Sequence, residues 1–374
     1  MNARYLSDFV CIRPDFIVHQ EDALAWITKM HVEAETKQSN LDQDQMMILA
    51  GQLHRVFKKI GLGKEKIQTR GMQLSDLFAK TPDAMVVYNI HKKPKGNGLK
   101  EKMDVFSKET LRVFHKIYKQ TDLPPHLIHV TCTGYVSPSP AQKIVSEQKG
   151  GHTSVTHSYH MGCYGAFPAL RIAGSHRKSD IVHTEFCTLH MDPLNHTAGQ
   201  LVIESLFADG FVKYTVSDIK ASQSPCLKIC ALHEIILPDS QDSMTWQCED
   251  WGFGMFLSKD VPLKIAMSLP DYVEELIKQA GLCSDDIYRQ AIFAIHPGGP
   301  KIISQVQEKL KLADWQVAHS KEILSSHGNM SSATLPHIWD KIVQDLSAAD
   351  GSYIVSMAFG PGLTISGSIF QKIG

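Results

Sequence analysis

The feature of this chain that most constrains its fold is the alternation of short β-branched runs with segments of helical periodicity. Residues 127–133 read LIHVTCT and end at Gly134 ahead of two prolines, which is typical of a buried strand entering a loop. Residues 291–295 (AIFAI) likewise run into a Pro-Gly-Gly-Pro turn. Apolar residues at helical spacing occupy three longer segments: 41–60, 102–119 and 269–281. Alternating strands and helices predict a layered α/β fold in which helices cover a largely buried sheet.

The length of the chain predicts two domains or two halves of one unit, since 374 residues can bury a large core. The polar stretch KASQSP at 220–225 lies between two strand-like runs and is the best candidate for the seam. We therefore place the halves at 1–221 and 222–374. No repeat is visible in the letters, so any duplication would have to be structural.

Charge and composition exclude several classes of protein. Lys and Arg number 38 against 39 Asp and Glu, so the overall charge gives no sign of a nucleic-acid or anionic-membrane partner, which would need a basic face; local basic patches stay open. The start of the chain, MNARYLSDFVCIRPDF, lacks the apolar core of a signal peptide, and no run approaches a membrane span. The 8 cysteines form no CxxC pair, which predicts reduced thiols in the cytoplasm.

Cys163 is the first candidate for chemistry. The residues after it (YGAFPALRIAG) are small and apolar, which predicts a helix buried on all sides with Cys163 at its start. Unpaired amides and the helix dipole at such a position lower the pKa of a thiol, and the thiolate is the form that attacks a thioester. Pro168 fits this helix only in its first turn. The alternative is an unreactive core cysteine.

Two later turns hold further candidates. The strand at 291–295 delivers His296 to a rigid Pro-Gly-Gly-Pro turn. Asn329 follows Gly328 in a polar turn before a helical run. Taken singly, a structural histidine and a turn or N-cap asparagine explain both residues equally simply.

The sequence also has features that relate to three other kinds of site: a metal site, a nucleotide-binding loop and the site of a cysteine hydrolase. Zinc could be bound by His152, His157, His160 and Cys163, but their spacing matches no structural zinc pattern, so no metal is predicted. The glycine-rich pieces HPGGP and AFGPGLTISG contain neither a dinucleotide-binding nor a P-loop pattern. A Cys–His–Asn set also suits a cysteine hydrolase, so that class stays open.

Several segments, taken in order, resemble the type III polyketide synthase (chalcone synthase-like) family of the thiolase superfamily. The resemblance runs from about residue 50 to the C-terminus and is carried by MGCYGAFPALRIA at 161–173, LFADG at 206–210, FLSKDVP at 256–262, HPGGPKI at 296–302, LSSHGNMSSA at 324–333 and FGPGLT at 359–364. It implies the thiolase fold, which is α/β with two similar halves in a layered αβαβα arrangement.

The resemblance implies a catalytic triad of Cys163, His296 and Asn329. Cys163 would accept an acyl chain from a thioester, and the chain would be extended by decarboxylative Claisen condensation with a malonyl thioester. His296 and Asn329 would donate hydrogen bonds to the extender's thioester oxygen and so stabilise the enolate. No cofactor is implied beyond thioesters of coenzyme A or of an acyl carrier protein, and the expected role is secondary metabolite biosynthesis.

The resemblance also outlines a substrate pocket. The two phenylalanines that flank the triad in plant members fall here on His190 and Met255, which predicts a less aromatic, differently shaped pocket. The residues expected to line it are Thr133, His190, Phe207, Met255, Ser331, Gly360 and Pro361. This departure leaves open a ketosynthase of the ketoacyl-ACP synthase III kind, or one that joins two β-ketoacyl chains into a pyrone-type product. A scaffold on a degenerate thiolase fold is the rival outside enzymes, although all three triad residue types are present.

Partners are implied more loosely. The basic helix end that accepts coenzyme A phosphates in the family is matched by Arg55, Lys58, Lys59 and Lys64, although unrelated surface cations explain the cluster equally well. The family further implies a homodimer, with the loop around Ser137-Pro138 reaching the partner's active-site wall.

Overall fold

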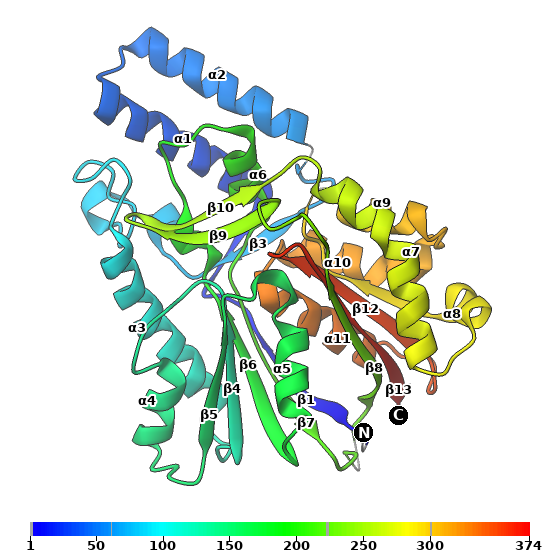
Figure 1. Ribbon diagram of the computed structural model, residues 1–374. Coiled ribbons are helices and arrows are strands. Elements are labelled where there is room, and N and C mark those ends of the chain that lie inside the picture. The colour runs from blue at the N-terminus through cyan, green and yellow to red at the C-terminus, as the bar shows by residue number, and fades with distance from the viewer. Residues whose placement is uncertain (1–2, 61, 222–223, 300) are drawn as a thin grey trace.

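The computed structural model describes residues 3–60, 62–221, 224–299 and 301–374. Within these residues, nine strands form one mixed sheet in the order β11-β12-β13-β8-β1-β7-β6-β4-β5 (Figure 1). The bounds of these strands are β1 Tyr5–Ile12, β4 His126–Thr131, β5 Ser154–Tyr159, β6 Lys178–Glu185, β7 Gly210–Ser217, β8 Cys226–Ile236, β11 Ile292–Ile295, β12 Tyr353–Gly360 and β13 Thr364–Ile373. Two further antiparallel pairs lie outside this sheet: β2 (Phe16–His19) with β3 (Thr69–Met72), and the hairpin of β9 (Met244–Glu249) and β10 (Gly252–Leu257).

The sheet contains the same pattern twice. In the first half β4 and β6 are parallel, and β6–β7 and β7–β1 are antiparallel. In the second half β11 and β12 are parallel, and β12–β13 and β13–β8 are antiparallel. Antiparallel pairing of β1 with β8 joins the two halves, and β5 adds a parallel strand beside β4. The two halves therefore share a strand topology, although no repeat is visible in their amino-acid sequences.

The predicted boundary between the halves falls in the connection from β7 to β8. Ser222, the first residue of the predicted second half, lies outside the described residues. The division at 221/222 therefore stays a prediction.

Two helices, one from each half, fill the central layer. These are α5 (Ala166–Ala173) and α11 (Thr334–Gln344), and the rings of Phe167 and Trp339 lie 5.9 Å apart between them. Side chains of the strands alternate between this layer and the outer ones because successive strand residues point to opposite faces. Ile181 on β6 belongs to the central core, whereas the neighbouring Val182 belongs to the core of the first half.

The outer layers are built from separate helices on each half. The helices α3 (Leu99–Ile117) and α4 (Pro140–Glu147) cover the first half, and α7 (Val261–Gln279) and α9 (Ile302–Lys309) cover the second (Figure 1). The predicted αβαβα arrangement is confirmed. The remaining α-helices of the described residues are α1 (Gln20–Ser39), α2 (Gln43–Ile60), α6 (Ala198–Leu206), α8 (Ser284–Gln290) and α10 (Ala318–His327).

The predicted elements agree with the structure in type and differ at their ends. The helix expected at 41–60 is α2, and the strand expected at 127–133 is β4. The helix expected at 269–281 begins earlier, at Val261, and continues through Pro270. Pro168 is the third residue of α5, in the first turn, where its missing amide disrupts no helical hydrogen bond.

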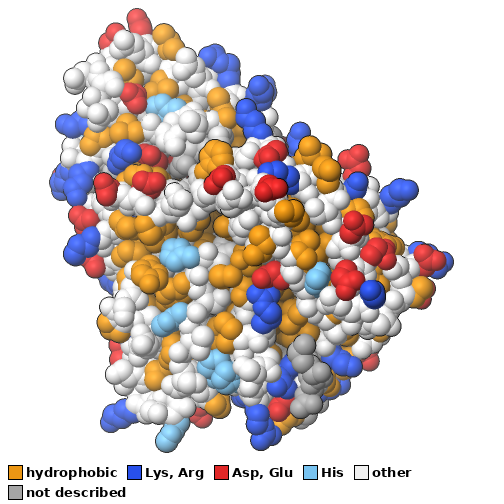
Figure 2. Space-filling model, in the orientation of Figure 1, with side chains coloured by type: hydrophobic (Ala, Val, Ile, Leu, Met, Phe, Trp, Pro, Cys, Tyr) orange, Lys and Arg blue, Asp and Glu red, His pale blue; other side chains and the backbone are white. Residues whose placement is uncertain are grey.

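The face shown in Figure 2 mixes positive and negative side chains without a continuous basic surface. Hydrophobic side chains gather across the middle of this face. In the part of the chain that the structure describes, no helix is long and apolar enough to cross a membrane.

Candidate active site

Two cavities meet at Cys163. The first, which we call the inner cavity, contains about 820 Å³ of space between atoms, part of it open to solvent, and is bordered by α1, β3, α6 and the β9–β10 pair. The second, the outer cavity, contains about 2130 Å³, part of it open to solvent, and is bordered by α6, α7 and α9. Cys163, Met244 and Met255 line both cavities. Exposed residues at the outer cavity, such as Thr197 and Lys301, mark it as the one that opens to the surface.

Cys163 stands where a loop enters the central layer. It is the middle residue of the short helix η3 (Gly162–Tyr164), which leads directly into α5, so its predicted place at a buried helix start is confirmed. Gly162 before it has φ of 71° and could not carry a side chain, because an added Cβ would come within 2.8 Å of Pro361. The Cys163 side chain is 8% exposed, and this exposed part faces the cavities.

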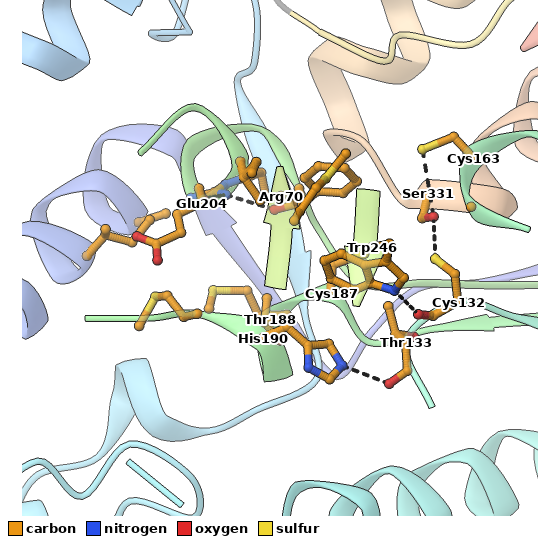
Figure 3. Close-up of a pocket in the computed structure, with 18 of the residues that line it drawn as sticks. Arg70, Cys132, Thr133, Cys163, Cys187, Thr188, His190, Glu204, Trp246 and Ser331 are labelled. Carbon is orange, nitrogen blue, oxygen red and sulfur yellow. Dashed lines mark hydrogen bonds between the residues drawn. The ribbon is translucent and has the colours of Figure 1, made fainter. Parts of the chain in front are cut away.

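Asn329 and Ser331 approach Cys163 from the second half of the molecule. They lie at the start of η6 (Ser331–Ala333), which leads into α11 as η3 leads into α5. The Oγ of Ser331 is 3.8 Å from the Sγ of Cys163 (Figure 3). The backbone N–H of Ser331 donates to Asn329 Oδ1 over 2.8 Å, which leaves the amide nitrogen of Asn329 without a hydrogen-bond partner although it is buried.

His296 follows β11 and is held by a backbone hydrogen bond to Met357 on β12. Its side chain is fully buried, and neither ring nitrogen has a hydrogen-bond partner. Gly298 lines the outer cavity, and a Cβ added to it would lie 3.5 Å from the Cδ2 of the His296 imidazole. The imidazole itself is not among the residues that line either cavity. Buried polar atoms without partners are rare in proteins and mark places where a ligand can supply the missing hydrogen bond.

The electrostatics of the site favour neutral groups. Burial raises the pKa of Cys163 to about 12, the charge of Glu185 adds to this, and the side chains of Ser331 and Asn329 act in the opposite direction. Burial lowers the pKa of His296 to about 3. Desolvation at this site therefore opposes the thiolate that the helix start predicts.

Six of the seven residues predicted for the substrate pocket line the inner cavity: Thr133, His190, Phe207, Met255, Ser331 and Pro361. Gly360 lines neither cavity. Its backbone lies against the ring of Tyr164, and any side chain at this position would collide with that ring.

His190 lies on η4 (Cys187–His190) and has both ring nitrogens engaged. Its Nε2 donates to the carbonyl oxygen of Thr133 over 2.8 Å (Figure 3). Its Nδ1 accepts from the backbone N–H of Phe253 over 3.0 Å. Burial and the nearby Lys102 lower the pKa of His190 to about 3. The sequence suggested a titratable side chain here; the structure shows a neutral ring in one tautomer.

Several lining residues were not predicted. The helix α1 contributes Ala23, Trp26 and Ile27 to the inner cavity. Trp246 of β9 also lines it and donates from Nε1 to the carbonyl oxygen of Cys132 over 2.5 Å. The first fifty residues carried no recognisable motif, so sequence reasoning had no signal that α1 reaches the site.

The four predicted cations Arg55, Lys58, Lys59 and Lys64 are exposed on and just after α2 and line neither cavity. Lys64 pairs with Glu21 over 3.1 Å. The helix α2 nevertheless packs beside α6, whose first residues border the outer cavity. Lys259 and Lys301, which sequence reasoning did not select, are the cations that line it directly.

No metal centre is evident. Among the residues that the structure describes, no three or more His, Cys, Asp or Glu side chains are grouped so as to hold an ion. Of the histidines considered for zinc, His157 is hydrogen-bonded to Ser139 over 2.8 Å, and the ring of His160 packs against Phe253.

Comparison with known proteins agrees with this geometry. Residues 228–374 match the family model for the C-terminal domain of chalcone and stilbene synthases. A type III polyketide synthase C of Arabidopsis thaliana is 29% identical over 66% of this chain and 67% of its own. A putative chalcone synthase of Bacillus subtilis is 26% identical over 72% of this chain and 80% of its own. A probable polyketide synthase 1 of Dictyostelium discoideum is 28% identical over 66% of this chain, but the match spans only 8% of that much longer protein.

The fold is shared over the whole chain. The C-terminal type III polyketide synthase domain of Steely1, a type I/III hybrid from Dictyostelium, superposes with a TM-score of 0.83 at 20% identity and covers 100% of both chains. The sequence matches to type III polyketide synthases and this shared fold support a condensing enzyme of the chalcone synthase type. The chain thus resembles type III polyketide synthases in sequence and shares their fold.

Proposed function

We propose that this protein is an acyltransferase that loads an acyl chain on Cys163 and extends it by decarboxylative condensation with a malonyl thioester. The observation that carries the proposal is a pair of buried, unpartnered polar groups, the imidazole of His296 and the amide nitrogen of Asn329. Asn329 stands two residues before Ser331, whose hydroxyl lies 3.8 Å from the Cys163 sulfur. Both groups can donate a hydrogen bond without bringing a charge. Preorganised donors of this kind stabilise negative charge that develops during a reaction.

Loading requires a proton transfer because the thiol of Cys163 is protonated at rest. His296 accepts this proton as the sulfur attacks the thioester carbonyl, and the leaving thiol takes it up afterwards. A neutral imidazole suits this role, since a protonated ring could not accept it.

Extension uses the same donors differently. The carbonyl oxygen of a malonyl thioester accepts hydrogen bonds from His296 and Asn329, loss of CO2 leaves an enolate, and the enolate carbon attacks the acyl group on Cys163. The bond from the acyl carbon to sulfur breaks, the Cys163 sulfur takes up a proton from water, and a β-ketoacyl thioester results. Asn329 is suited to hold this oxyanion because its own carbonyl is fixed by the Ser331 amide over 2.8 Å.

The shape of the inner cavity supports an apolar starter. Trp26, Ile27 and Met244 are among its lining residues, so an alkyl chain attached to Cys163 would be buried against apolar side chains. The outer cavity would hold the coenzyme A or carrier arm of the incoming thioester, and the four cations of α2 would bind its phosphates.

The discriminating experiment is incubation with an acyl-CoA starter and malonyl-CoA without carrier protein. We expect pyrone- or resorcinol-type products by mass spectrometry. Release of free acid without decarboxylation would indicate a cysteine hydrolase, and activity only with carrier-bound substrates would indicate a ketosynthase of the ketoacyl-ACP synthase III kind. A cytoplasmic homodimer, with the loop around Ser137-Pro138 completing the partner's site, belongs to the same proposal and is tested by sedimentation.

A further inference from the structure

A second thiol lies deeper in the site than Cys163. The Sγ of Cys132 is 2.9 Å from the Oγ of Ser331, and the Sγ of Cys163 is 3.8 Å from the same oxygen (Figure 3). One hydroxyl therefore bridges two buried sulfurs. Both cysteines are free and both line the inner cavity.

Cys132 also has a base beside it. Its Sγ donates to Glu185 Oε2 over 3.5 Å, and its backbone N–H donates to both oxygens of the same carboxylate over 3.2 and 3.1 Å. Burial raises the pKa of Glu185 to about 6, so this carboxylate can accept and return a proton near neutral pH. Burial and the charge of Glu185 raise the pKa of Cys132, so its thiol stays protonated until that base removes the proton.

The order in which a substrate meets the two thiols follows from the cavities. Cys163 lines both cavities, whereas Cys132 lines only the inner one. A thioester that enters through the outer cavity therefore reaches Cys163 first. An acyl chain bound there extends into the inner cavity past Cys132.

We propose that Cys132 is a second acyl acceptor, to which Cys163 passes its chain; this inference rests on the proposed loading of Cys163. Glu185 takes the proton of the Cys132 thiol as its sulfur bonds to the acyl carbon on Cys163. The bond from that carbon to the Cys163 sulfur breaks, and the Cys163 sulfur receives the proton that Glu185 held. One thioester replaces another, so nothing is oxidised or reduced and no atom is lost.

The transfer gives the enzyme two acyl groups at once. With the first chain stored on Cys132, the thiol of Cys163 is free to accept a second thioester. The substrate class is therefore a pair of acyl thioesters, and the relay favours products in which two separately loaded chains are joined.

The test is the acyl stoichiometry of the protein, measured by intact mass after exposure to an acyl-CoA starter without extender. Peptide mapping locates each group, and neutral hydroxylamine identifies thioesters by cleaving them. Cys132→Ser removes the thiol but keeps a hydroxyl that can bond to Glu185 and Ser331. Cys226→Ala is the matched control, because Cys226 is buried but lies outside both cavities.

We expect two hydroxylamine-sensitive acyl groups on the native chain and on Cys226→Ala, one on Cys132→Ser, and none on Cys163→Ala. A single group on the native chain, located at Cys163, would overturn the relay and leave the proposed function intact. A second group located on Cys187, or acylation of Cys132 in Cys163→Ala, would also overturn it. Absence of any acyl group from the native chain would overturn both proposals.

Discussion

The sulfur of Cys163 and the hydroxyl of Ser331 lie 3.8 Å apart, and each residue belongs to the short helix that opens one of two equivalent helices of the central layer. The duplication of the fold thus has a chemical consequence. The start of α5 carries the proposed nucleophile, and the start of α11 carries the Ser331 hydroxyl beside it and the proposed carboxamide donor, Asn329. The proposed site therefore needs both halves.

The division of labour between Cys163 and Asn329 gives the first prediction. Cys163→Ala removes the acyl acceptor, so we expect no acyl-enzyme by intact mass while malonyl-CoA decarboxylation continues. Asn329→Ala removes one oxyanion donor, so we expect normal loading but decarboxylation slower by about 100- to 1,000-fold. Product CO2 and acyl-enzyme mass are measured in parallel. Equal loss of both steps in Asn329→Ala would contradict the assigned roles, provided that its melting temperature is unchanged.

The state of the thiol gives a second prediction. Because burial raises the pKa of Cys163 to about 12, the thiolate fraction should rise about tenfold per pH unit from pH 7 to 10. The rate at which iodoacetamide alkylates Cys163, followed by peptide mapping, should rise with the same slope. Ser331→Ala should slow the reaction at each pH, because the Ser331 hydroxyl lowers this pKa. A rate that is already level above about pH 7 would instead indicate a preformed thiolate.

The class of fold could be predicted from the sequence because strand and helix signals are local. The run at 127–133 and the apolar spacing at 41–60 identified β4 and α2 without knowledge of their neighbours. The placement of Cys163 before α5 could also be predicted, since the small apolar residues after it are contiguous in the chain. Assignment of His296 and Asn329 to the same site required the family resemblance, because they lie far from Cys163 in sequence.

Other properties of the site could not be predicted because they depend on contacts between distant segments. The protonated state of Cys163 follows from its desolvation by several packed elements, which no local pattern reveals. Likewise, α1 lines the inner cavity only because the β2–β3 pairing, in which Val18 faces Arg70, brings it there. In the sequence, Cys132 is one more apolar residue at a strand end. Only the distance between its sulfur and the Ser331 hydroxyl indicates a role in the site.

His190 gives a third prediction. His190→Phe should change the chain length or starter preference of the product, because the ring borders the inner cavity. It should also lower the free energy of unfolding by about 2–4 kcal/mol, since the Thr133 carbonyl and the Phe253 amide both lose their partner. Denaturant unfolding and product mass spectra check the two effects. His190→Gln, which can still donate and accept, should be less destabilised; an unchanged product spectrum in His190→Phe would show that the ring does not contact the chain.

The α1 wall of the inner cavity gives a fourth prediction. Ala23 is buried at this wall, and Ala23→Phe would fill the space available to the far end of a long acyl chain. We expect kcat/KM to fall by about tenfold or more for long-chain starters and to change little for short ones. Ala34→Phe is the control for damage to α1, because Ala34 is buried on the same helix but lines neither cavity. A uniform loss for all starter lengths in Ala23→Phe would mean that the chain does not reach α1.

The two candidate sets of phosphate-binding cations give the last prediction. Lys259 and Lys301 line the outer cavity, whereas Lys58 and Lys59 lie on the exposed end of α2, which packs beside α6. If the α2 cations bind the phosphates of coenzyme A, the double change Lys58→Ala and Lys59→Ala should raise KM for acyl-CoA by about three- to tenfold at low salt with kcat nearly constant. The same variant should treat an N-acetylcysteamine thioester, which has no phosphates, like the native chain. A rise in KM confined to Lys259→Ala and Lys301→Ala would assign the phosphates to the mouth of the outer cavity instead. An equal rise in KM for both thioesters would show that the substitutions affect binding of the thioester arm or the fold, and not binding of the coenzyme A phosphates.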